Sequence, residues 1–567
     1  MILERLLDFH DTQEQIVPAA LKAQRVRWFL DLDEDGRFLG LTDPGAKKAD
    51  QAELIAPYAK RSGAQPPPYL FVDKPDYVLG HVAEADKLSA QAQERERTKA
   101  GERHAEYVAL SRACAAAVDH AAPAAFIRFL DTQISEARAE AETLSMKPGD
   151  LVAPRVGGQI LTDLPAVRQF WQEQQDAASV EKSSLVAECL VTGITGPIAR
   201  THPVELLVGP NRVGLVSANE NAFLSYGLQQ SEIAPMSFTA ARKYGEALRH
   251  LLSEERHHLR VGGVTWVYWT REDTGTDLLF AVKTADPDEV ARLLQTPRSG
   301  QPRSALDANA FYALAVSANT SRMVVRSWVT ASLTEVQHNI RRYFERMRLL
   351  GRDGEPRYHS YRALAGALVR DFKDLPDHVV PSILNTALWG RPLPLSLLHQ
   401  AVQRARAERE HVLTHPRAAL IKLVLQSHPS FPEEYAMSDQ LSPDHPHPAY
   451  QCGRLLALLD NIQAEAVGAR ATLVDRYYGS ASATPASVFG VLMRNAQNHL
   501  GKIRKTKGGL AYFFDQQIGE IARHLNEAGG FPRTLTLEEQ GVFALGFYQE
   551  RNRPRKADDA GAGTPAS

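Results

Sequence analysis

The sequence predicts an α+β fold, with a mixed N-terminal region of β-hairpins and helices followed by a C-terminal all-helical bundle. Short runs rich in β-branched and aromatic residues, such as 261–269, cluster in the first part of the chain. Stretches dominated by Ala, Glu, Gln, Arg and Lys favour helix at 82–147 and again after about 330. Four prolines between 431 and 448 then separate the last helical stretch from the rest.

The first 147 residues are expected to form an α+β module. The chain opens with an amphipathic helix start, and residues 26–32 alternate in the manner of a strand. The turn signal Asp33-Glu34-Asp35-Gly36 follows directly, which predicts a hairpin. A helical segment over 82–147 completes the module.

The remaining elements follow in order. Strand-like runs at 204–208, 213–216 and 261–269, interrupted by a helical stretch at 238–256, predict an α+β central domain. The later boundaries come from helix-forming composition, proline content and a small, polar C-terminus. The predicted divisions are 1–147, 148–330 for the central domain, 331–430 for a helical connecting region, 431–448 for a proline-rich linker, 449–550 for the helical bundle and 551–567 for a disordered tail.

Size and composition limit the classes of function. A chain of 567 residues suggests two to four domains on the scale of roughly 100 to 200 residues each. The net charge of −2 excludes a protein that coats nucleic acid by bulk positive charge, so a nucleic-acid surface would have to be a local patch. Three widely separated cysteines argue against a disulfide framework and against a Cys-based zinc site, and no run is long and apolar enough for a membrane span. A cytoplasmic protein is expected.

The sequence contains no convincing motif for catalysis. The segment Gly209 to Gly214 lacks the Gly-Lys-Ser/Thr ending of a P-loop. Cys189 and His202 could form a thiol nucleophile with its base, but the apolar run around Cys189 is typical of a buried thiol. The acids at 31–36 and the adjacent His10-Asp11 are typical of turns and helix ends. We therefore expect no catalytic residues, no metal site and no cofactor.

A loop between 59 and 74 is the first candidate binding surface. Cations, a hydroxyl and an amide lie on a segment that prolines would stiffen, which suits phosphate contacts beside a group that reads a base edge. The alternative is a solvated loop joining two strands. The candidate residues are Lys60, Arg61, Ser62, Gln65 and Lys74.

The second candidate surface covers 217–231 and is dense in amides and hydroxyls around two aromatic residues. These groups suit DNA or partner-subunit contacts, whereas Asn and Ser could equally cap a helix that starts near Asn221. The candidate residues are Ser217, Asn219, Asn221, Tyr226, Gln229, Gln230 and Ser231.

The third candidate surface, 493–509, carries five Lys or Arg and no acid. At helical spacing Arg494, Gln497 and Asn498 share one face, and a cluster of Lys and Arg follows, which suits contact with the phosphate backbone of a strand; a merely solvated basic turn is the alternative. The candidate residues are Arg494, Asn495, Gln497, Asn498, Lys502, Arg504, Lys505 and Lys507.

Four blocks in order along the chain resemble the large subunit of the type I-C CRISPR Cascade complex, a Csd-type family. They are Arg61-Ser62-Gly63 with Tyr69-Leu70 and Tyr77-Val78-Leu79-Gly80; Cys189 to Gly193 with Pro197 to Pro203; Ser217 to Pro235; and His499 to Lys502 with Leu537 to Tyr548. One departure is that Pro66-Pro67-Pro68 precedes Tyr69 where family members commonly place an Asn. Reading of a base edge could therefore pass from that position to Gln65, Ser62 or the Asn219/Asn221 block.

The resemblance implies a non-catalytic subunit that recognises the PAM of double-stranded DNA targets, aids duplex opening and steadies the displaced strand of the R-loop. It implies as partners a crRNA-containing Cascade complex with backbone, crRNA-processing and small subunits, and transiently a helicase-nuclease. It also implies that the C-terminal bundle resembles the small subunit and can be made separately, for which Met437 is a candidate internal start. A structural scaffold or recruiter of other Cas proteins, without PAM reading, is the alternative.

Overall fold

The structure is a computed structural model of the full chain. It describes all residues except 1, 14, 46–50, 60, 62–65, 83–88, 145, 182–184, 203, 219, 273, 276, 278, 296–308, 409–411, 430, 433–435, 469–472 and 554–567.

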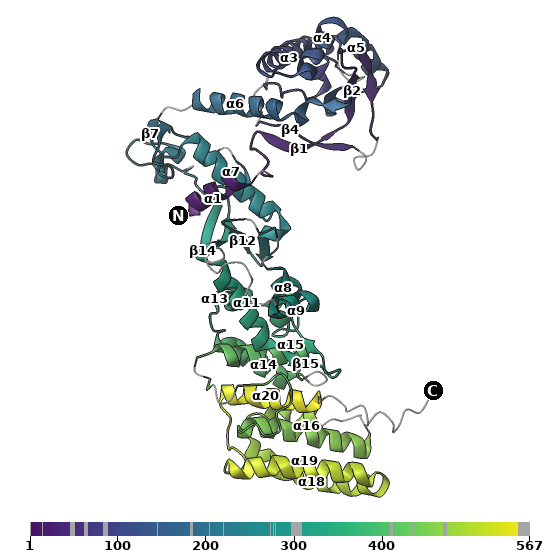
Figure 1. Ribbon diagram of the computed structural model, residues 1–567, viewed down its shortest axis with the longest axis vertical. Helices are drawn as coiled ribbons and strands as arrows, with labels where there is room; N and C mark the ends of the chain where they lie inside the picture. The colour runs from purple at the N-terminus through teal and green to yellow at the C-terminus, as the bar shows by residue number, and fades with distance from the viewer. Residues whose placement is uncertain are drawn as a thin grey trace. The chain divides into compact units, whose positions relative to one another are not determined.

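The chain forms two compact units (Figure 1), and each is described by itself. The first comprises Met1–Glu254 and Val316–Arg326, and the second comprises Glu255–Ala315 and Ser327–Ser567. The expected fold class is confirmed, since strands and helices mix in the N-terminal part and the C-terminal part is helical. The finer domain boundaries stay predictions.

A four-stranded sheet organises the start of the first unit. Its order is β3-β2-β5-β6, with bounds Phe38–Thr42, Trp28–Leu32, Val152–Val156 and Gln159–Ile160. The predicted hairpin is confirmed, because β2 pairs antiparallel with β3 across the Asp33–Gly36 turn. β2 also pairs in parallel with β5, which is far away in sequence. A separate antiparallel pair joins β1 (Leu21–Val26) and β4 (Ala52–Pro57).

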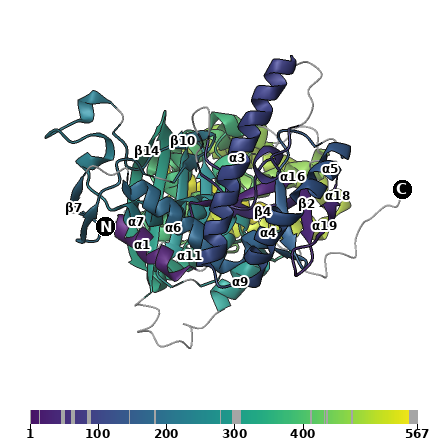
Figure 2. The same ribbon diagram turned by 90° about the horizontal axis from the view of Figure 1, so that it is seen from above.

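Helices pack against this sheet and bury its apolar face. They are α2 (Pro75–Val78), α3 (Ala90–Ala117), α4 (Ala121–Thr132) and α5 (Ile134–Thr143). Phe126 and Phe129 of α4 enter the same core as Leu30 of β2 and Tyr107 of α3. The N-terminal end of α3 extends away from this core (Figure 2), and most of its first two turns are exposed. Beyond these turns, the helix is held by burial of Ala100, Tyr107 and Cys114.

The rest of the first unit carries helices α1 (Ile2–Thr12), α6 (Pro165–Glu181) and α7 (Phe238–Ser253). Two small hairpins lie between α6 and α7 in sequence, one formed by β7 (Val186–Glu188) and β8 (Thr195–Pro197) and one by β9 (Leu206–Val208) and β10 (Asn211–Val213). α7 is strongly amphipathic, and Tyr244, Leu248 and Leu251 are buried on one face.

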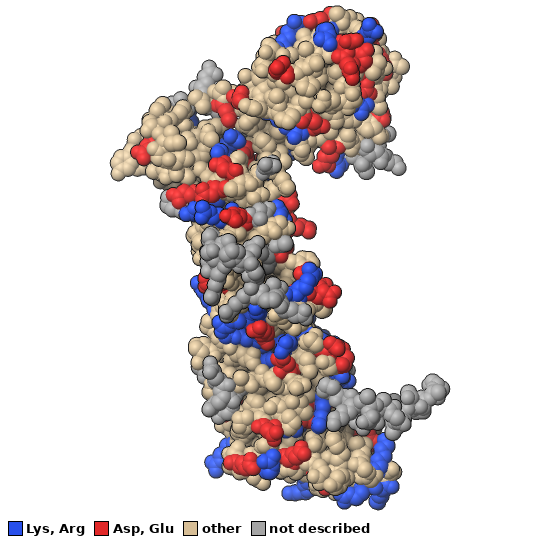
Figure 3. Space-filling model, viewed as in Figure 1, with Lys and Arg blue, Asp and Glu red and all other residues tan. Residues whose placement is uncertain are grey.

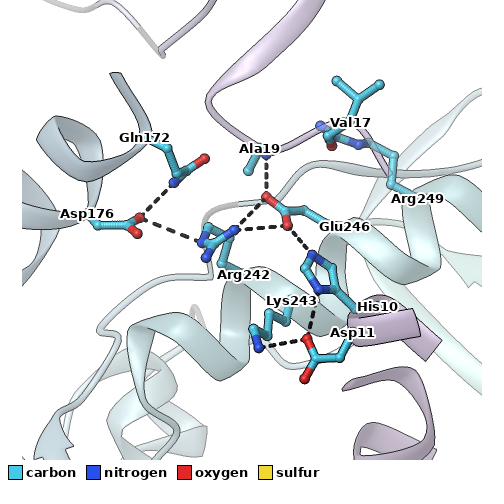
Figure 4. Close-up of polar contacts among 10 residues, drawn as sticks. All are labelled: His10, Asp11, Val17, Ala19, Gln172, Asp176, Arg242, Lys243, Glu246 and Arg249. Carbon is cyan, nitrogen blue, oxygen red and sulfur yellow. Dashed lines mark hydrogen bonds and ion pairs between the residues drawn. The ribbon is translucent and has the colours of Figure 1, made fainter. Parts of the chain in front are cut away.

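A polar network joins α1, α6 and α7 (Figure 4). The carboxylate of Glu246 on α7 is fully buried; it lies 2.7 Å from His10 Nε2 and 3.1 Å from Arg242 Nη1. It also accepts the backbone N–H of Ala19. Arg242 Nε lies 3.7 Å from Asp176 Oδ1 on α6. A buried carboxylate with several charged and neutral donors is stable in its ionised form, and the network therefore fixes the N-terminal helix to α7.

The second unit begins with strands and continues as helices. The sheet has the order β11-β12-β13-β14, with bounds His258–Val261, Val264–Thr270, Ala310–Asn319 and Arg322–Ser332; the parts of β13 and β14 within Val316–Arg326 belong to the first unit. The short helices α8 (Phe280–Thr284) and α9 (Pro287–Gln295) lie between β12 and β13, and a small hairpin is formed by β15 (Leu349–Leu350) and β16 (Pro356–Arg357). The longer sequence of helices is α11 (Leu333–Met347), α12 (Tyr361–Gly366), α13 (Val379–Trp389), α14 (Leu395–Ala407), α15 (His415–Ser427), α16 (Pro448–Val467), α17 (Leu473–Ala481), α18 (Pro485–Thr506), α19 (Gly508–Glu527) and α20 (Leu537–Arg551).

One continuous hydrophobic core runs through these helices. The last helix, α20, packs against α14, α15 and α16. The described part of the proline-rich segment 431–448 joins this core: Met437 is only 4% exposed. Nearby, Lys422 Nζ on α15 lies 2.8 Å from Asp439 Oδ1. The segment expected to be a linker is thus packed within the second unit.

No helix in the described part of the chain is both long and apolar enough to cross a lipid bilayer.

Candidate nucleic-acid interface

Arg61 is the centre of the first candidate loop, and its side chain points into the protein. Its Nη1 donates to Asp73 Oδ1 at 2.9 Å, its Nη2 pairs with Asp73 Oδ2, and its Nε donates to the Pro67 carbonyl at 2.7 Å. The guanidinium also lies 3.5 Å and 4.6 Å from the ring centres of Tyr69 and Tyr77. Only 14% of the Arg61 side chain is exposed. Arg61 therefore fastens the loop to the segment just before α2, where Asp73 forms an isolated bridge with Val152.

The Asp73 carboxylate completes this anchor. It is fully buried and accepts the backbone N–H groups of Tyr69 and Lys74 at 2.7 Å and 2.8 Å. Lys74, the next residue, is exposed and is the N-cap residue of α2. Lys60, Ser62 and Gln65 lie outside the described residues, so the assignment of this loop to the PAM stays a prediction.

Replacement of Asp73 by asparagine is expected to lower the free energy of unfolding by about 2–3 kcal/mol, because the largely buried Arg61 loses its charged partner. The matched control is Asp163→Asn, which disrupts a half-exposed ion pair with Arg168 in the same unit and should cost less than about 1 kcal/mol. Urea denaturation of both variants measures the difference. Equal losses in the two variants would show that the Arg61 anchor contributes no more than a surface pair.

The second candidate block forms an exposed loop with a tight turn at Tyr226-Gly227. Both residues have positive φ, 53° and 77°, and Ser225 bridges to Leu228. Such a turn requires the left-handed conformation at its two central positions, which glycine adopts without strain and tyrosine does not. The Tyr226 side chain is 98% exposed. The loop therefore holds an aromatic ring in solvent on a short, fixed turn.

The other predicted residues of this block divide between surface and interior. Ser217, Asn221, Gln229 and Gln230 are exposed, whereas Asn219 lies outside the described residues. Ser231 is 4% exposed and its backbone N–H donates to the Arg200 carbonyl, so it supports the loop from inside. In place of a helix beginning near Asn221, the structure has a three-residue 3-10 turn, Asn221–Phe223, because the chain turns back at Tyr226-Gly227.

The third candidate block is the second half of α18 and the turn that follows it. Its apolar residues Leu492, Ala496 and Leu500 are buried, and the predicted polar residues lie on the exposed face. Those exposed residues are Arg494, Asn495, Gln497, Asn498, Lys502, Arg504, Lys505 and Lys507. Lys and Arg side chains gather along this edge of the C-terminal helices (Figure 3).

The charges of this block are only partly neutralised. Lys507 pairs with Glu465 at 2.6 Å, and Arg504 lies 3.8 Å from Asp515. Within the residues that the structure describes, Arg494, Lys502 and Lys505 form no ion pair. Burial and the charge of Lys502 lower the pKa of His499, as expected beside a positive surface. We call the exposed residues of 494–507 the basic face of α18.

Two exposed aromatic side chains at the start of α19 escaped the sequence-based interpretation. Tyr512 is 67% exposed and Phe513 is 45% exposed, although both belong to an otherwise well-packed helix. The sequence feature that could have indicated them is the run Tyr512-Phe513-Phe514, which begins five residues after Lys507. A helix needs only one of three consecutive aromatic rings for its buried face. Exposed rings close to a basic surface are typical of sites that stack unpaired bases.

The residues considered for catalysis have structural partners. His10 belongs to the α1–α7 network, and His202 contacts the Tyr244 hydroxyl, with burial lowering the pKa of His202 to about 4. Burial acts to raise the pKa of Cys189, but hydrogen bonds from Thr192 and nearby backbone lower it to about 7. The thiol is nevertheless only 1% exposed. Among the described residues, no group of three or more His, Cys, Asp or Glu could hold a metal ion.

Comparison with known protein families matches almost the whole chain to one family. The family described as CRISPR-associated protein (Cas_Csd1) matches residues 3–554. No curated protein gave a significant match. The family match covers all three candidate surfaces and confirms the resemblance carried by the four sequence blocks. The chain therefore belongs to the Cas_Csd1 family of CRISPR-associated proteins.

Proposed function

We propose that this chain is the non-catalytic large subunit of a type I-C Cascade complex, and that it recognises the PAM of a DNA target and stabilises the displaced strand of the R-loop. The observation that carries the proposal is the basic face of α18, which presents unpaired cations in a chain whose net charge is only −2. Localised positive charge of this kind supports contact with a phosphate backbone.

The basic face and the rings of α19 suit a single strand better than a duplex. Lys502 and Lys505 would neutralise phosphates, and Tyr512 offers a ring on which a base from an opened duplex can stack. Stacking needs unpaired bases, so the combination favours the strand that the guide RNA displaces.

PAM reading is assigned to the first unit, where two loops offer amides and hydroxyls. The loop of 60–74 is fixed at its base by the Arg61–Asp73 pair, and the loop of 217–231 exposes Gln229, Gln230 and the ring of Tyr226. An anchored loop base and a fixed turn reduce the conformational entropy that is lost on binding, which supports recognition of a short duplex sequence. In this proposal base pairing with the guide RNA reads the rest of the target.

The proposed partners are the crRNA-containing complex with its backbone, crRNA-processing and small subunits, the target duplex, and transiently a helicase-nuclease that cuts the DNA. The chain itself is proposed to cut nothing. Incubation of the purified chain with duplex and single-stranded DNA, in magnesium or manganese, tests this point directly; cleavage that survives further purification would contradict it.

Reconstitution of the complex with and without this chain tests the proposed function. We expect tight binding of a matched target only with the chain and with the correct PAM. We also expect the Lys502→Glu/Lys505→Glu variant to bind more weakly and to lower the slope of log K against log salt by about 1.4, the value for two single-strand phosphate contacts. Arg370→Glu/Lys373→Glu, two exposed cations elsewhere in the second unit, is the matched control and should bind like the wild type.

A second candidate function is the docking of another protein subunit. The β7–β8 hairpin and the residues around it expose Val186, Leu190 and Ile194 by 63–69% and carry few charges. Exposed apolar side chains at this density are typical of protein interfaces. If the complex binds its target equally well with a scrambled PAM, or without this chain, the docking role would replace PAM reading.

A further inference from the structure

A cavity of about 300 Å³ lies in the second unit, where three separate segments of the chain meet. Arg352 and Arg357 come from the β15–β16 hairpin, Thr414 and His415 from the start of α15, and Tyr548 and Arg551 from the end of α20. None of these residues belongs to the three candidate surfaces. The volume is at the lower end of the range for ligand pockets, which suits a small group.

The lining of this cavity is strongly basic. It contains three guanidinium groups and no carboxylate. Asp353 pairs with Arg357 at 2.8 Å from outside the lining, but both side chains are about half exposed, so the pair is weak. Arg352 Nε donates to Asn552 Oδ1 at 3.2 Å, a neutral partner that leaves the positive charge of Arg352 intact. The cavity therefore retains net positive charge.

The arginines and the ring side chains are close enough to influence one another. Burial raises the pKa of Tyr548 to about 12, while Arg357 and Arg352 act to lower it. Burial and the charge of Arg357 lower the pKa of His415 to about 4. His359 Nε2 lies 2.7 Å from His415 Nδ1 and fixes the orientation of that ring. The cations thus converge on one space and do not merely lie on the same surface.

The backbone adds to this positive field. α15 has 13 residues and begins at His415, and its N-cap residue Thr414 makes no side-chain capping hydrogen bond. The first N–H groups of a helix have no partner within the helix, although Pro416 contributes no N–H here, and the helix dipole places partial positive charge at the same end. Both Thr414 and His415 line the cavity, so the helix start reinforces the three arginines.

We propose that this cavity binds a phosphate group of a nucleic-acid strand. The guanidinium fork matches the geometry of phosphate oxygens, and three such forks around a small cavity exceed what two carboxylates can satisfy, namely Asp353 beside Arg357 and the buried Asp460 near Arg551. The group is either a terminal phosphate monoester or an internal diester of the strand. The inference rests on the proposed function only in taking the ligand from a nucleic acid; it requires neither PAM reading nor the basic face of α18.

The test uses the full chain and two fluorescent 12-nucleotide single strands without a PAM, one with a 5′-phosphate and one with a 5′-hydroxyl. We expect Arg352→Gln/Arg357→Gln/Arg551→Gln to bind at least one of them more than tenfold more weakly, with a salt slope lower by about 2, the value for three lost single-strand contacts. A loss confined to the 5′-phosphorylated strand identifies a terminal phosphate, and equal losses for both strands identify a diester. Wild-type affinity of the triple variant for both strands would overturn the proposal.

Two further variants control for charge and folding. Arg212→Gln/Arg292→Gln/Arg370→Gln removes three exposed arginines elsewhere and should stay within twofold of the wild type. Arg357→Lys keeps the charge but removes the fork, and is expected to weaken binding several-fold even if the triple variant fails to fold. PAM discrimination in the reconstituted complex is measured separately. If the complex discriminates the PAM as proposed while the triple variant binds both 12-nucleotide strands like the wild type, the cavity proposal is rejected and the proposed function is retained.

Discussion

Replacement of Arg454 by methionine is expected to lower the free energy of unfolding by about 3–5 kcal/mol. The Arg454 side chain is fully buried on α16, and its Nε lies 2.8 Å from Oε2 of Glu550 on α20, which is 5% exposed. Its Nη1 donates to the Pro443 carbonyl at 2.8 Å and to Gln451 Oε1 at 2.9 Å. Without the guanidinium, the buried Glu550 would keep only the part-exposed Arg553, 4.0 Å away, as a charged neighbour, and Gln451 Oε1 would lose this donor. Guanidinium chloride denaturation, followed by circular dichroism, measures the loss.

A double variant separates the cost of the unpaired charge from the value of the pair. Arg454→Met/Glu550→Leu removes both charges and should recover much of the lost stability, because a buried ion pair and an apolar pair of similar volume are often close in free energy. The exposed pair of Arg523 and Glu527 provides the comparison, since Arg523→Met should cost less than about 1 kcal/mol. A loss at Arg454 as small as that at Arg523 would contradict the interpretation.

Local patterns in the sequence predicted the local structure well. The alternation of 26–32 followed by an Asp-Gly turn yields the β2–β3 hairpin, and the Ala- and Glu-rich stretch of 82–147 yields α3 to α5. The parallel pairing of β2 with β5 was not predictable, because no pattern within either strand records a partner more than a hundred residues away. The burial of Met437 in the proline-rich segment was not predictable either, since prolines mark breaks in helices whether or not the chain between them is packed.

The candidate surfaces show the same limit at the level of single side chains. The exposed residues of 494–507 could be predicted because a helix places them on the face opposite Leu492, Ala496 and Leu500. The inward orientation of the Arg61 side chain could not be predicted in this way, because its buried partner lies 12 positions later and two tyrosine rings lie against its guanidinium. The arginine-lined cavity was not predictable at all, because 351–357, 412–415 and 548–552 carry no shared motif.

The closest approach of α16 to α20 depends on two glycines, and alanine at either is expected to destabilise the protein. A Cβ at Gly453 would lie 2.7 Å from the Phe547 backbone nitrogen and still closer to the Phe543 carbonyl oxygen. A Cβ at Gly546 would meet the Tyr450 backbone, with its carbonyl carbon at 3.0 Å. Backbone cannot yield as a flexible side chain can, so the helices must separate. We expect each Gly→Ala variant to lose about 1–3 kcal/mol, measured by denaturation.

Glycines on exposed parts of neighbouring helices serve as controls for this prediction. Gly490 in α18 and Gly519 in α19 have open space around them, and alanine there should raise the free energy of unfolding by roughly 0.5–1 kcal/mol through its better helix propensity. The same chemical change is thus expected to have opposite signs at the helix contact and on the surface. Stabilisation by alanine at Gly453 or Gly546 would mean that the two helices are further apart than the structure has them.

Because α20 also packs on α14 and α15, a product begun at Met437 would keep the α16–α20 contact but expose the opposite face of α20. Such a product is expected to need a partner that covers this face, and a monomeric, fully folded 437–567 fragment would argue against it.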